Sequence, residues 1–240
     1  MKQTALVIGG SGDIGSAVVR AMADQGMAVW ASYYGTVPPL ADIAKDVHFC
    51  QMDLGVEKSV KKAFKKIFAV HSKIDTVVFS ATAPVQNKKL LELKWPEIQK
   101  HLDVQLKGMF NVIQALKRQI SQKSRTKVIV ILTEYCVGRP PASLAHYLSA
   151  KYSLMGFAKA MAVELPRYNW TINLVSPGMV ESSLISSLPA KLIELAKGNN
   201  PLKRIGQPDD VAKLVLFLAS AEADYLNGAH ITLNGGSVML

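Results

Sequence analysis

Short runs of apolar residues alternate along the whole chain with segments of helical periodicity. Each run is continuously apolar, as in strands whose two faces are both covered. We predict strands over residues 4–8, 28–32, 47–51, 76–80, 127–132, 171–175 and 229–233. The segments between them predict helices near 14–25, 40–45, 57–70, 95–119, 147–165, 185–197 and 208–220.

This alternation of strands and helices is typical of an α/β fold with a doubly wound parallel sheet, flanked by helices on both faces. No linker, repeat or low-complexity stretch interrupts the pattern, so we expect residues 1–240 to form a single domain. Ligands of such sheets bind at the carboxyl ends of the strands, where the strand order reverses. We therefore expect the functional site at these strand ends.

The composition argues against several classes of protein. Hydrophobic residues make up 49% of the 240 residues, which suffices for a sizeable core. No apolar run reaches the roughly 18 residues of a membrane span, and the start of the chain lacks the pattern of a secretory signal. Cys50 and Cys136 form neither a disulfide framework nor a metal motif, and Cys136 is interpreted as a packing residue. We expect a cytoplasmic protein without a metal site.

The formal net charge of +10 allows an acidic partner. The densest group of positive charges lies in the predicted helix 57–70 and comprises Lys58, Lys61, Lys62, Lys65 and Lys66. Apolar residues form the other face of this helix, so we interpret the lysines as its solvated side. No nucleic-acid motif accompanies them, which leaves an anionic cofactor or an acidic carrier protein as the candidate partner.

The first predicted strand ends in a glycine-rich turn that reads Gly-Gly-Ser-Gly-Asp-Ile-Gly over residues 9–15, and a helix follows. Glycines let the backbone approach a phosphate, and the N-terminus of a helix offers free N–H groups. The turn therefore indicates a dinucleotide site, although a tight strand–helix turn can also be purely structural.

The end of the second predicted strand bears on the choice of dinucleotide. A carboxylate there would bind the ribose hydroxyls of NAD and would repel the 2′-phosphate of NADP. Residues 32–37 hold no carboxylate, although they hold no arginine either. We therefore expect NADP(H) to be preferred over NAD(H). After the third strand, Asp53 either accepts a hydrogen bond from adenine or caps the next helix.

Tyr147 and Lys151 are the candidate acid–base pair. They lie four residues apart at the start of a predicted helix, so their side chains share one face. A nearby positive charge lowers the pKa of a phenol, which suits it to donate a proton to a carbonyl oxygen. The same spacing also occurs in ordinary surface pairs, so the interpretation depends on the motifs elsewhere in the chain.

Together these motifs resemble the short-chain dehydrogenase/reductase family over the whole length from Val7 to Gly236. The resemblance is densest in four segments, which read Tyr-Leu-Ser-Ala-Lys (147–151), Ile-Asn-Leu-Val-Ser-Pro-Gly (172–178), Pro-Leu-Lys-Arg-Ile-Gly-Gln-Pro-Asp-Asp-Val-Ala (201–212) and Asn-Gly-Gly (234–236). Within the family, the chain is most similar to 3-oxoacyl-(acyl-carrier-protein) reductases. The resemblance implies a Rossmann-type fold and hydride transfer between a nicotinamide and a carbonyl or alcohol.

The resemblance also assigns roles to individual residues. Tyr147 would be the acid of the reduction, while Lys151 would bind the nicotinamide ribose and lower the pKa of Tyr147. Thr133 and Gln105 would complete the catalytic set. The cofactor would be held by Gly9, Ser11, Asp13, Ile14, Gly15, Tyr33, Asp53, Leu54, Ser80, Ala81, Thr82, Tyr147, Lys151, Pro177, Gly178, Val180 and Ser182.

Several of these residues depart from the family pattern. Asp13 stands at the middle glycine of the cofactor loop, and Thr82 stands at the glycine that follows the fourth strand. Gln105 replaces a helix asparagine that supports a proton-relay water. Thr133 replaces the catalytic serine, in an alignment that would put Glu134 there if shifted by one. These departures leave a second hypothesis open, in which a degenerate family member binds a nucleotide or a protein without turnover.

The segment 178–205 is the expected substrate segment. Its apolar residues suit an acyl chain or a hydrophobic ketone but also fit an ordinary pair of amphipathic helices; they are Leu184, Ile185, Leu188, Leu192 and Ile193. For an acidic acyl carrier protein, Arg139, Arg167 and Lys191 are expected near the mouth of the site, unless they only solubilise the surface.

A homo-oligomer, a tetramer or a dimer, is also implied by the resemblance. Two helices would pair across a two-fold axis through an apolar surface, unless the same residues pack within one subunit. These residues are Met109, Phe110, Ile113, Met155, Phe157 and Met161.

Overall fold

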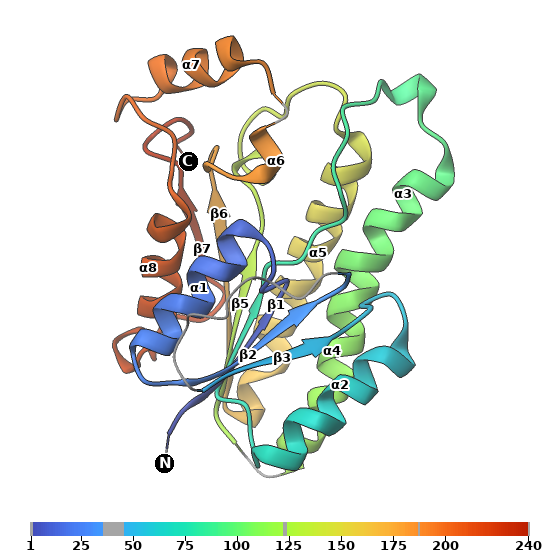
Figure 1. Cartoon of the computed structure of the whole chain (residues 1–240), viewed down its shortest axis with the longest axis vertical. Helices are drawn as coiled ribbons and strands as arrows, with labels where there is room; N and C mark the ends of the chain where they lie inside the picture. Colours follow the sequence, from blue (N-terminus) through green and yellow to red (C-terminus); the bar gives the residue numbers. More distant parts are fainter. Residues whose placement is uncertain (1, 36–45, 122–123, 187, 240) are drawn as a thin grey trace.

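Seven parallel strands form the centre of the molecule in the computed structural model, which describes residues 2–35, 46–121, 124–186 and 188–239. The strands are β1 (Thr4–Ile8), β2 (Ala28–Tyr33), β3 (Val47–Gln51), β4 (Thr76–Phe79), β5 (Thr126–Ile131), β6 (Trp170–Pro177) and β7 (His230–Leu233). Their order in the sheet is β3-β2-β1-β4-β5-β6-β7 (Figure 1). All seven predicted strands are therefore present, within two residues at each end.

The strand order reverses at β1, which pairs with β2 on one side and with β4 on the other. Leu6 of β1 lies opposite Trp30 of β2 and Val77 of β4. The carboxyl ends of β1 and β4 consequently bound the crevice in which doubly wound sheets bind their ligands.

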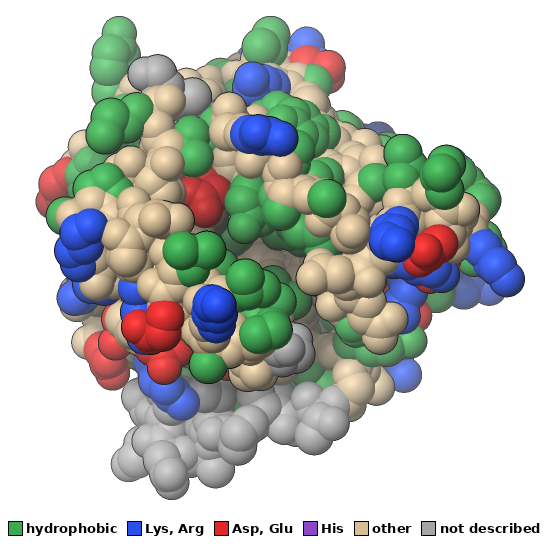
Figure 2. Space-filling view, turned by 90° about the horizontal axis from the view of Figure 1, so that it is seen from above, with side chains coloured by type: hydrophobic (Ala, Val, Ile, Leu, Met, Phe, Trp, Pro, Cys, Tyr) green, Lys and Arg blue, Asp and Glu red, His purple; other side chains and the backbone are tan. Residues whose placement is uncertain are grey.

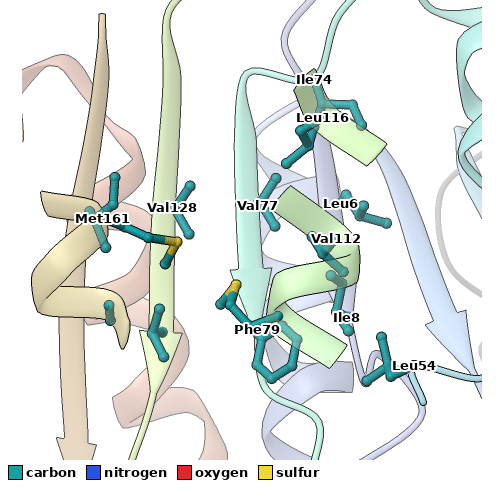
Figure 3. Close-up of a cluster of buried hydrophobic side chains, with 14 of the residues drawn as sticks. Leu6, Ile8, Leu54, Ile74, Val77, Phe79, Val112, Leu116, Val128 and Met161 are labelled. Atoms are coloured by element: carbon teal, nitrogen blue, oxygen red, sulfur yellow. The ribbon is translucent and has the colours of Figure 1, made fainter. Parts of the chain in front are cut away.

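Helices cover both faces of the sheet (Figure 1). On one face lie α1 (Asp13–Asp24) and α8 (Pro208–Ala219); on the other lie α2 (Glu57–Val70), α4 (Gly108–Ser121) and α5 (Ala145–Glu164). Figure 3 shows part of the hydrophobic core on the face covered by α2, α4 and α5, where Ile8, Phe79 and Val112 lie together between the sheet and α4. Because β1 is buried on both faces, its residues from Ala5 to Ile8 are all apolar.

Two predicted helices are divided in the structure. The segment 95–119 forms α3 (Trp95–Leu102), a π-helical turn over Asp103–Lys107 and then α4. The segment 185–197 forms α6 (Ser183–Ser186) and α7 (Ala190–Asn199), because a proline at 189 disfavours helical backbone in the residue before it. The predicted helix 40–45 lies outside the described residues.

Short 3₁₀ turns complete the chain; they span Leu90–Glu92, Glu134–Cys136, Pro166–Tyr168 and Ala221–Ala223. The five lysines of α2 are all exposed, as the amphipathic pattern predicts. Within the described ranges, no helix has both the length and the apolar character that crossing a membrane requires.

Candidate active site

Two cavities open at the carboxyl ends of the strands, on the face shown in Figure 2, where hydrophobic side chains surround a hollow. The first cavity, of about 400 Å³, lies between the start of α5 and the segment after β6. The second, of about 440 Å³, lies beside the glycine-rich turn. They adjoin each other, because both are lined by Ile14, Val85, Ser182 and Leu184.

Tyr147 lies in the first turn of α5 and contributes to the wall of the first cavity. The residue is 8% exposed, and the Thr133 side chain lines the same cavity beside it. Burial raises the pKa of the Tyr147 phenol, and the Thr133 side chain opposes this shift. The phenol is thus held in its protonated form, which can donate to a carbonyl oxygen.

Lys151 lies one turn further along α5 and is buried. Its Nζ donates a 2.8 Å hydrogen bond to the carbonyl of Ile131 and lies 5.7 Å from the centre of the Tyr147 ring. Burial lowers the pKa of Lys151 to about 8. The pKa of Tyr147 is raised overall, because desolvation of the phenol is the largest influence on it, and the expected lowering of this pKa by Lys151 stays a prediction.

Thr133 lies two residues after the end of β5 and lines the first cavity together with Tyr147. The Thr133 Oγ1 also accepts a long, 3.5 Å hydrogen bond from the backbone N–H of Tyr135. Glu134, the residue that the shifted alignment puts at the serine position, lines the same cavity but is hydrogen-bonded elsewhere, to Ser237. The hydroxyl function at this site is therefore supplied by Thr133.

Gln105 and Thr82, two of the departures from the family pattern, are bonded to each other. The Gln105 Nε2 donates to the Thr82 hydroxyl at 3.2 Å, and that hydroxyl donates to the Ala83 carbonyl at 3.3 Å. Gln105 is fully buried in the π-helical turn, and its amide oxygen has no hydrogen-bond partner among the described residues. The Gln105 amide nitrogen is thus hydrogen-bonded to the segment after β4, and the amide oxygen can still accept a hydrogen bond.

The glycine-rich turn has the geometry of a phosphate cradle. Gly9 has a φ of +78°, and a Cβ on it would lie 2.8 Å from the Ala81 backbone. A Cβ on Gly15 would lie only 2.1 Å from the Gly9 carbonyl oxygen. Gly12, the residue that precedes α1, provides no side-chain cap, so the first N–H groups of the helix remain available beside the second cavity. These residues fit the pyrophosphate of a dinucleotide.

Asp13 is the first residue of α1, and its side chain is hydrogen-bonded to the substrate segment. Its carboxylate accepts hydrogen bonds from the Ser183 N–H at 2.9 Å and from the Ser183 hydroxyl at 2.7 Å. Ser183 begins α6, so the cofactor turn is bonded to the substrate segment. Both residues line the second cavity.

The residues expected around adenosine lie along the ends of β2 and β3. Tyr33 ends β2 and is half-buried; the residues after Gly35 in this stretch are outside the described ranges. Asp53 accepts a 3.0 Å hydrogen bond from the Gly55 N–H. It therefore stabilises the turn before α2 and does not cap that helix, whose N-cap is Val56. Leu54 is buried beside it.

The segment after β6 forms one wall of both cavities. Gly178 follows the strand and donates its N–H to the Leu233 carbonyl at 3.0 Å, while Val180 forms a parallel bridge to Gly206. The Ser182 hydroxyl donates to the Val180 carbonyl at 3.1 Å. The other expected cofactor residues of the turns, Ser11, Ile14, Ser80 and Ala81, lie at the carboxyl ends of β1 and β4.

Three of the five apolar residues of the substrate segment line the first cavity, namely Leu184, Ile185 and Leu188. Leu192 and Ile193 lie on α7 and are not among its lining residues. The apolar wall is therefore contributed by α6 and the residues around it.

Two expectations about the surface need correction. Arg167 does not lie near the mouth of the site: it follows the far end of α5 and precedes β6, so it lies at the opposite edge of the sheet. Arg139 and Lys191 are exposed on the cavity side.

Among the residues expected at a subunit interface, Met109 and Met161 are buried in this chain's own core.

Sequence reasoning missed several residues of the first cavity, including Gln86, Asn87 and Leu144, and did not connect Ser237 to the site. The rule that sites gather at strand ends could have indicated Gln86 and Asn87, which follow β4. No local pattern marks Ser237, because its contact with Glu134 spans 103 residues of the chain. Cys136 is buried in the core, as expected of a packing residue.

Comparison with known proteins agrees with this geometry. A family model described as enoyl-(acyl carrier protein) reductase matches residues 10–237. The 3-oxoacyl-[acyl-carrier-protein] reductase FabG of Staphylococcus epidermidis is 31% identical over the full length of both chains. The FabG of Aquifex aeolicus is 32% identical, covering 98% of this chain and 96% of its own.

Two further similar proteins extend the comparison. An acetoacetyl-CoA reductase of Acinetobacter sp. is 28% identical over 99% of this chain and 98% of its own. The crystal structure of gox2181 superposes with a TM-score of 0.90 at 27% identity, covering 98% of this chain and 95% of that one.

Proposed function

Since the chain belongs to the short-chain dehydrogenase/reductase family and is an NAD(P)-dependent oxidoreductase of carbonyl or hydroxyl groups, we propose that it is an NADPH-dependent ketoreductase. Its proposed substrate is a 3-oxoacyl thioester on an acyl carrier or a related apolar ketone. The position of Tyr147 and Thr133 together in the wall of one largely apolar cavity carries this proposal.

Tyr147 is the proposed proton donor. Its phenol is protonated and lines the cavity, and a carbonyl oxygen seated beside it would receive its proton during reduction. The Thr133 hydroxyl lines the same cavity beside Tyr147, and it can turn its single proton to the same carbonyl oxygen when a substrate binds and so fix the position of that oxygen. The two hydroxyls thereby supply both the proton and the orientation.

Lys151 is the proposed partner of Tyr147 on the cofactor side. Its ammonium is one helical turn from the phenol and would stabilise the phenolate that remains after proton transfer. The free amide oxygen of Gln105 is proposed to hold a water molecule through which the proton is replaced. Both roles require these side chains to keep their buried positions.

The nicotinamide cofactor supplies the hydride when it is bound. Its pyrophosphate is proposed to lie on the turn from Gly9 to Gly15, its adenosine near Tyr33 and Asp53, and its carboxamide against the segment from Pro177 to Ser182. The lack of a carboxylate among residues 32–35 favours NADPH over NADH, because no negative charge opposes a 2′-phosphate.

An acidic acyl carrier is the proposed partner for a carrier-bound substrate. Arg139 and Lys191 provide positive charge beside the cavity, and the names of the FabG relatives point to carrier-bound substrates.

The cytoplasm remains the proposed location, since both cysteines are free thiols. A homo-oligomer also remains a proposal, for which Phe110, with 48% of its surface exposed, offers apolar surface.

The decisive experiment follows NADPH oxidation with a panel of 3-oxoacyl thioesters and ketones. Replacing Tyr147 by Phe removes only the hydroxyl, and we expect kcat/KM to fall by about 10²–10⁴-fold, the usual contribution of a general acid. The dissociation constant for NADPH should change little. Tyr225→Phe, the same change at a fully exposed site, is the matched control. Cofactor binding without turnover of any carbonyl would contradict the proposal.

The carrier proposal is tested by reversing charge. Arg139→Glu and Lys191→Glu should raise KM for a carrier-bound thioester severalfold while changing KM for a free ketone little. Arg167→Glu, with the same change at the opposite edge of the sheet, is the control. Equal effects of all three variants would argue against docking of a carrier here.

A further inference from the structure

Glu134 is a buried acidic residue in the wall of the first cavity. It follows Thr133 directly, begins a 3₁₀ turn and is 8% exposed. Its carboxylate also borders the segment after β6, since a Cβ on Gly178 would lie 3.3 Å from the Glu134 Oε2. The carboxylate therefore lies between the two segments that bound the proposed reaction site.

The Glu134 carboxylate has few partners within the protein. Ser237 donates its hydroxyl to the Glu134 Oε2, and this is the only side-chain hydrogen bond that the carboxylate receives among the described residues. No lysine, arginine or histidine lines the cavity, and Glu134 forms no ion pair in the described part of the chain. A carboxylate has about four acceptor positions, so most of its capacity is left for a ligand.

A buried carboxylate without a cation is costly unless hydrogen-bond donors satisfy it. Water can supply them in the free protein, but a substrate that fills the cavity displaces this water. A substrate without a donor would leave the carboxylate unpaired, whereas one with a hydroxyl or an ammonium would restore the lost hydrogen bonds. A negatively charged group at the same place would be repelled.

We propose that Glu134 is a specificity-determining residue that selects carbonyl substrates with a hydrogen-bond donor, a hydroxyl or an ammonium group, close to the reacting carbonyl. The donor must be close because Glu134 is the neighbour of Thr133 and lines the same cavity as Thr133 and Tyr147. The rest of the substrate is apolar, as the walls formed by Leu184, Ile185 and Leu188 require. This inference rests on the proposed ketoreductase function. Within that function it favours apolar ketones with a donor beside the carbonyl over 3-oxoacyl thioesters, which carry no such donor there.

The first test compares a straight-chain methyl ketone with the hydroxy ketone that carries one added hydroxyl on its methyl carbon. In the wild-type protein with NADPH, kcat/KM should favour the hydroxy ketone by about tenfold or more, the size expected of a hydrogen bond to a charged group. In Glu134→Met, which has no comparable acceptor, this ratio should fall to about one. Glu134→Gln, closer in shape, serves if the first variant does not fold and should also lower the ratio.

A second test does not depend on turnover. The dissociation constants of a straight-chain alcohol, its matching diol and its matching amino alcohol are measured with the protein saturated with NADP⁺. The wild type should bind the diol and the amino alcohol severalfold more tightly than the plain alcohol, and Glu134→Gln should lose the preference for the amino alcohol first. Glu164→Gln, an exposed glutamate at the far end of α5, is the matched control and should keep both preferences.

The outcomes separate this inference from the proposed function. If ketones are reduced but the wild type shows no preference for donors, or the preference survives in both Glu134 variants, the inference is overturned and the reductase stands. If no ketone is reduced, the proposed function fails, and the binding test alone then shows whether Glu134 selects ligands that carry a hydrogen-bond donor. Equal binding of the three alcohols would then overturn the inference as well.

Discussion

Asp13 of the cofactor turn and Ser183 of the substrate segment are joined by two hydrogen bonds, although 170 residues separate them in the chain. The negative charge of Asp13 lies at the N-terminus of α1, where we expect the pyrophosphate. The N–H and hydroxyl of Ser183 both donate hydrogen bonds to the Asp13 carboxylate, so this carboxylate faces the start of α6. The chain can therefore carry an acidic residue in the turn while keeping the phosphate cradle.

Asp13→Asn should strengthen NADPH binding. The amide keeps an acceptor for Ser183 but removes a negative charge near the pyrophosphate, an effect of about 0.3–1 kcal/mol or about two- to fivefold in the dissociation constant. Fluorescence titration at low and high salt measures it, and the gain should shrink with salt. Asp24→Asn, at the exposed last position of the same helix, is the control. Weaker binding by Asp13→Asn would show that the full carboxylate is needed.

Lys151→Met should stabilise the protein most below pH 8. Burial lowers the pKa of Lys151 from 10.5 to about 8, so the native state holds a desolvated charge at neutral pH. Between these pH values the unfolded state binds the proton and the native state does not, so wild-type stability rises with pH. The advantage of the variant should therefore shrink by up to about 3 kcal/mol over this range.

Urea unfolding of wild type and Lys151→Met at a series of pH values measures this difference. Lys62→Met, which changes a lysine exposed on α2, is the control. A constant difference between wild type and Lys151→Met across the range would contradict the prediction.

Gly15→Ala should disrupt the cofactor turn. The added methyl would lie 2.1 Å from the Gly9 carbonyl oxygen, so the backbone must shift. We expect a loss of about 1–3 kcal/mol in the free energy of unfolding, together with weaker binding of both NADPH and NADH. Gly198→Ala, where a Cβ meets nothing within 4 Å, should change stability by less than about 1 kcal/mol. Denaturant unfolding compares the two variants.

Tyr33→Asp should reverse the preference between the two dinucleotides. The new carboxylate at the end of β2 would repel the 2′-phosphate of NADPH and accept hydrogen bonds from the ribose of NADH. We expect NADPH to bind about tenfold more weakly, while NADH binds equally well or better. Tyr33→Asn, which carries no charge, is the matched control. Parallel losses for both dinucleotides would indicate a structural defect instead.

The sheet could be predicted from the sequence because its central strands are buried on both faces and are therefore rich in apolar residues. The strand limits of β1 and β3 were predicted to the residue. The divided helices could not be predicted, because the π-helical turn around Gln105 follows no periodicity that distinguishes it from a continuous helix. The break before α7 follows from Pro189, which disfavours helical backbone in the residue before it. The helical spacing of the apolar residues continues across this proline, so it predicted one helix.

The site was only partly predictable for a related reason. Tyr147 and Lys151 are joined by local spacing on one helix, which a sequence displays directly. The contacts of Asp13 with Ser183 and of Glu134 with Ser237 join distant segments and leave no local pattern. The direction of the Tyr147 pKa shift was missed because burial, not the neighbouring charge, determines it.

The contact between Glu134 and Ser237 has a practical consequence for handling this protein. Val238 packs against the turn at Gly138, and its carbonyl accepts a 2.9 Å hydrogen bond from the Asn234 Nδ2, so residues 234–238 support one wall of the active site. The first strand begins at the other end of the sheet (Figure 1). We therefore expect an affinity tag attached before β1 to leave the first cavity unchanged, whereas a change to residues 234–238 would shift the Glu134 carboxylate.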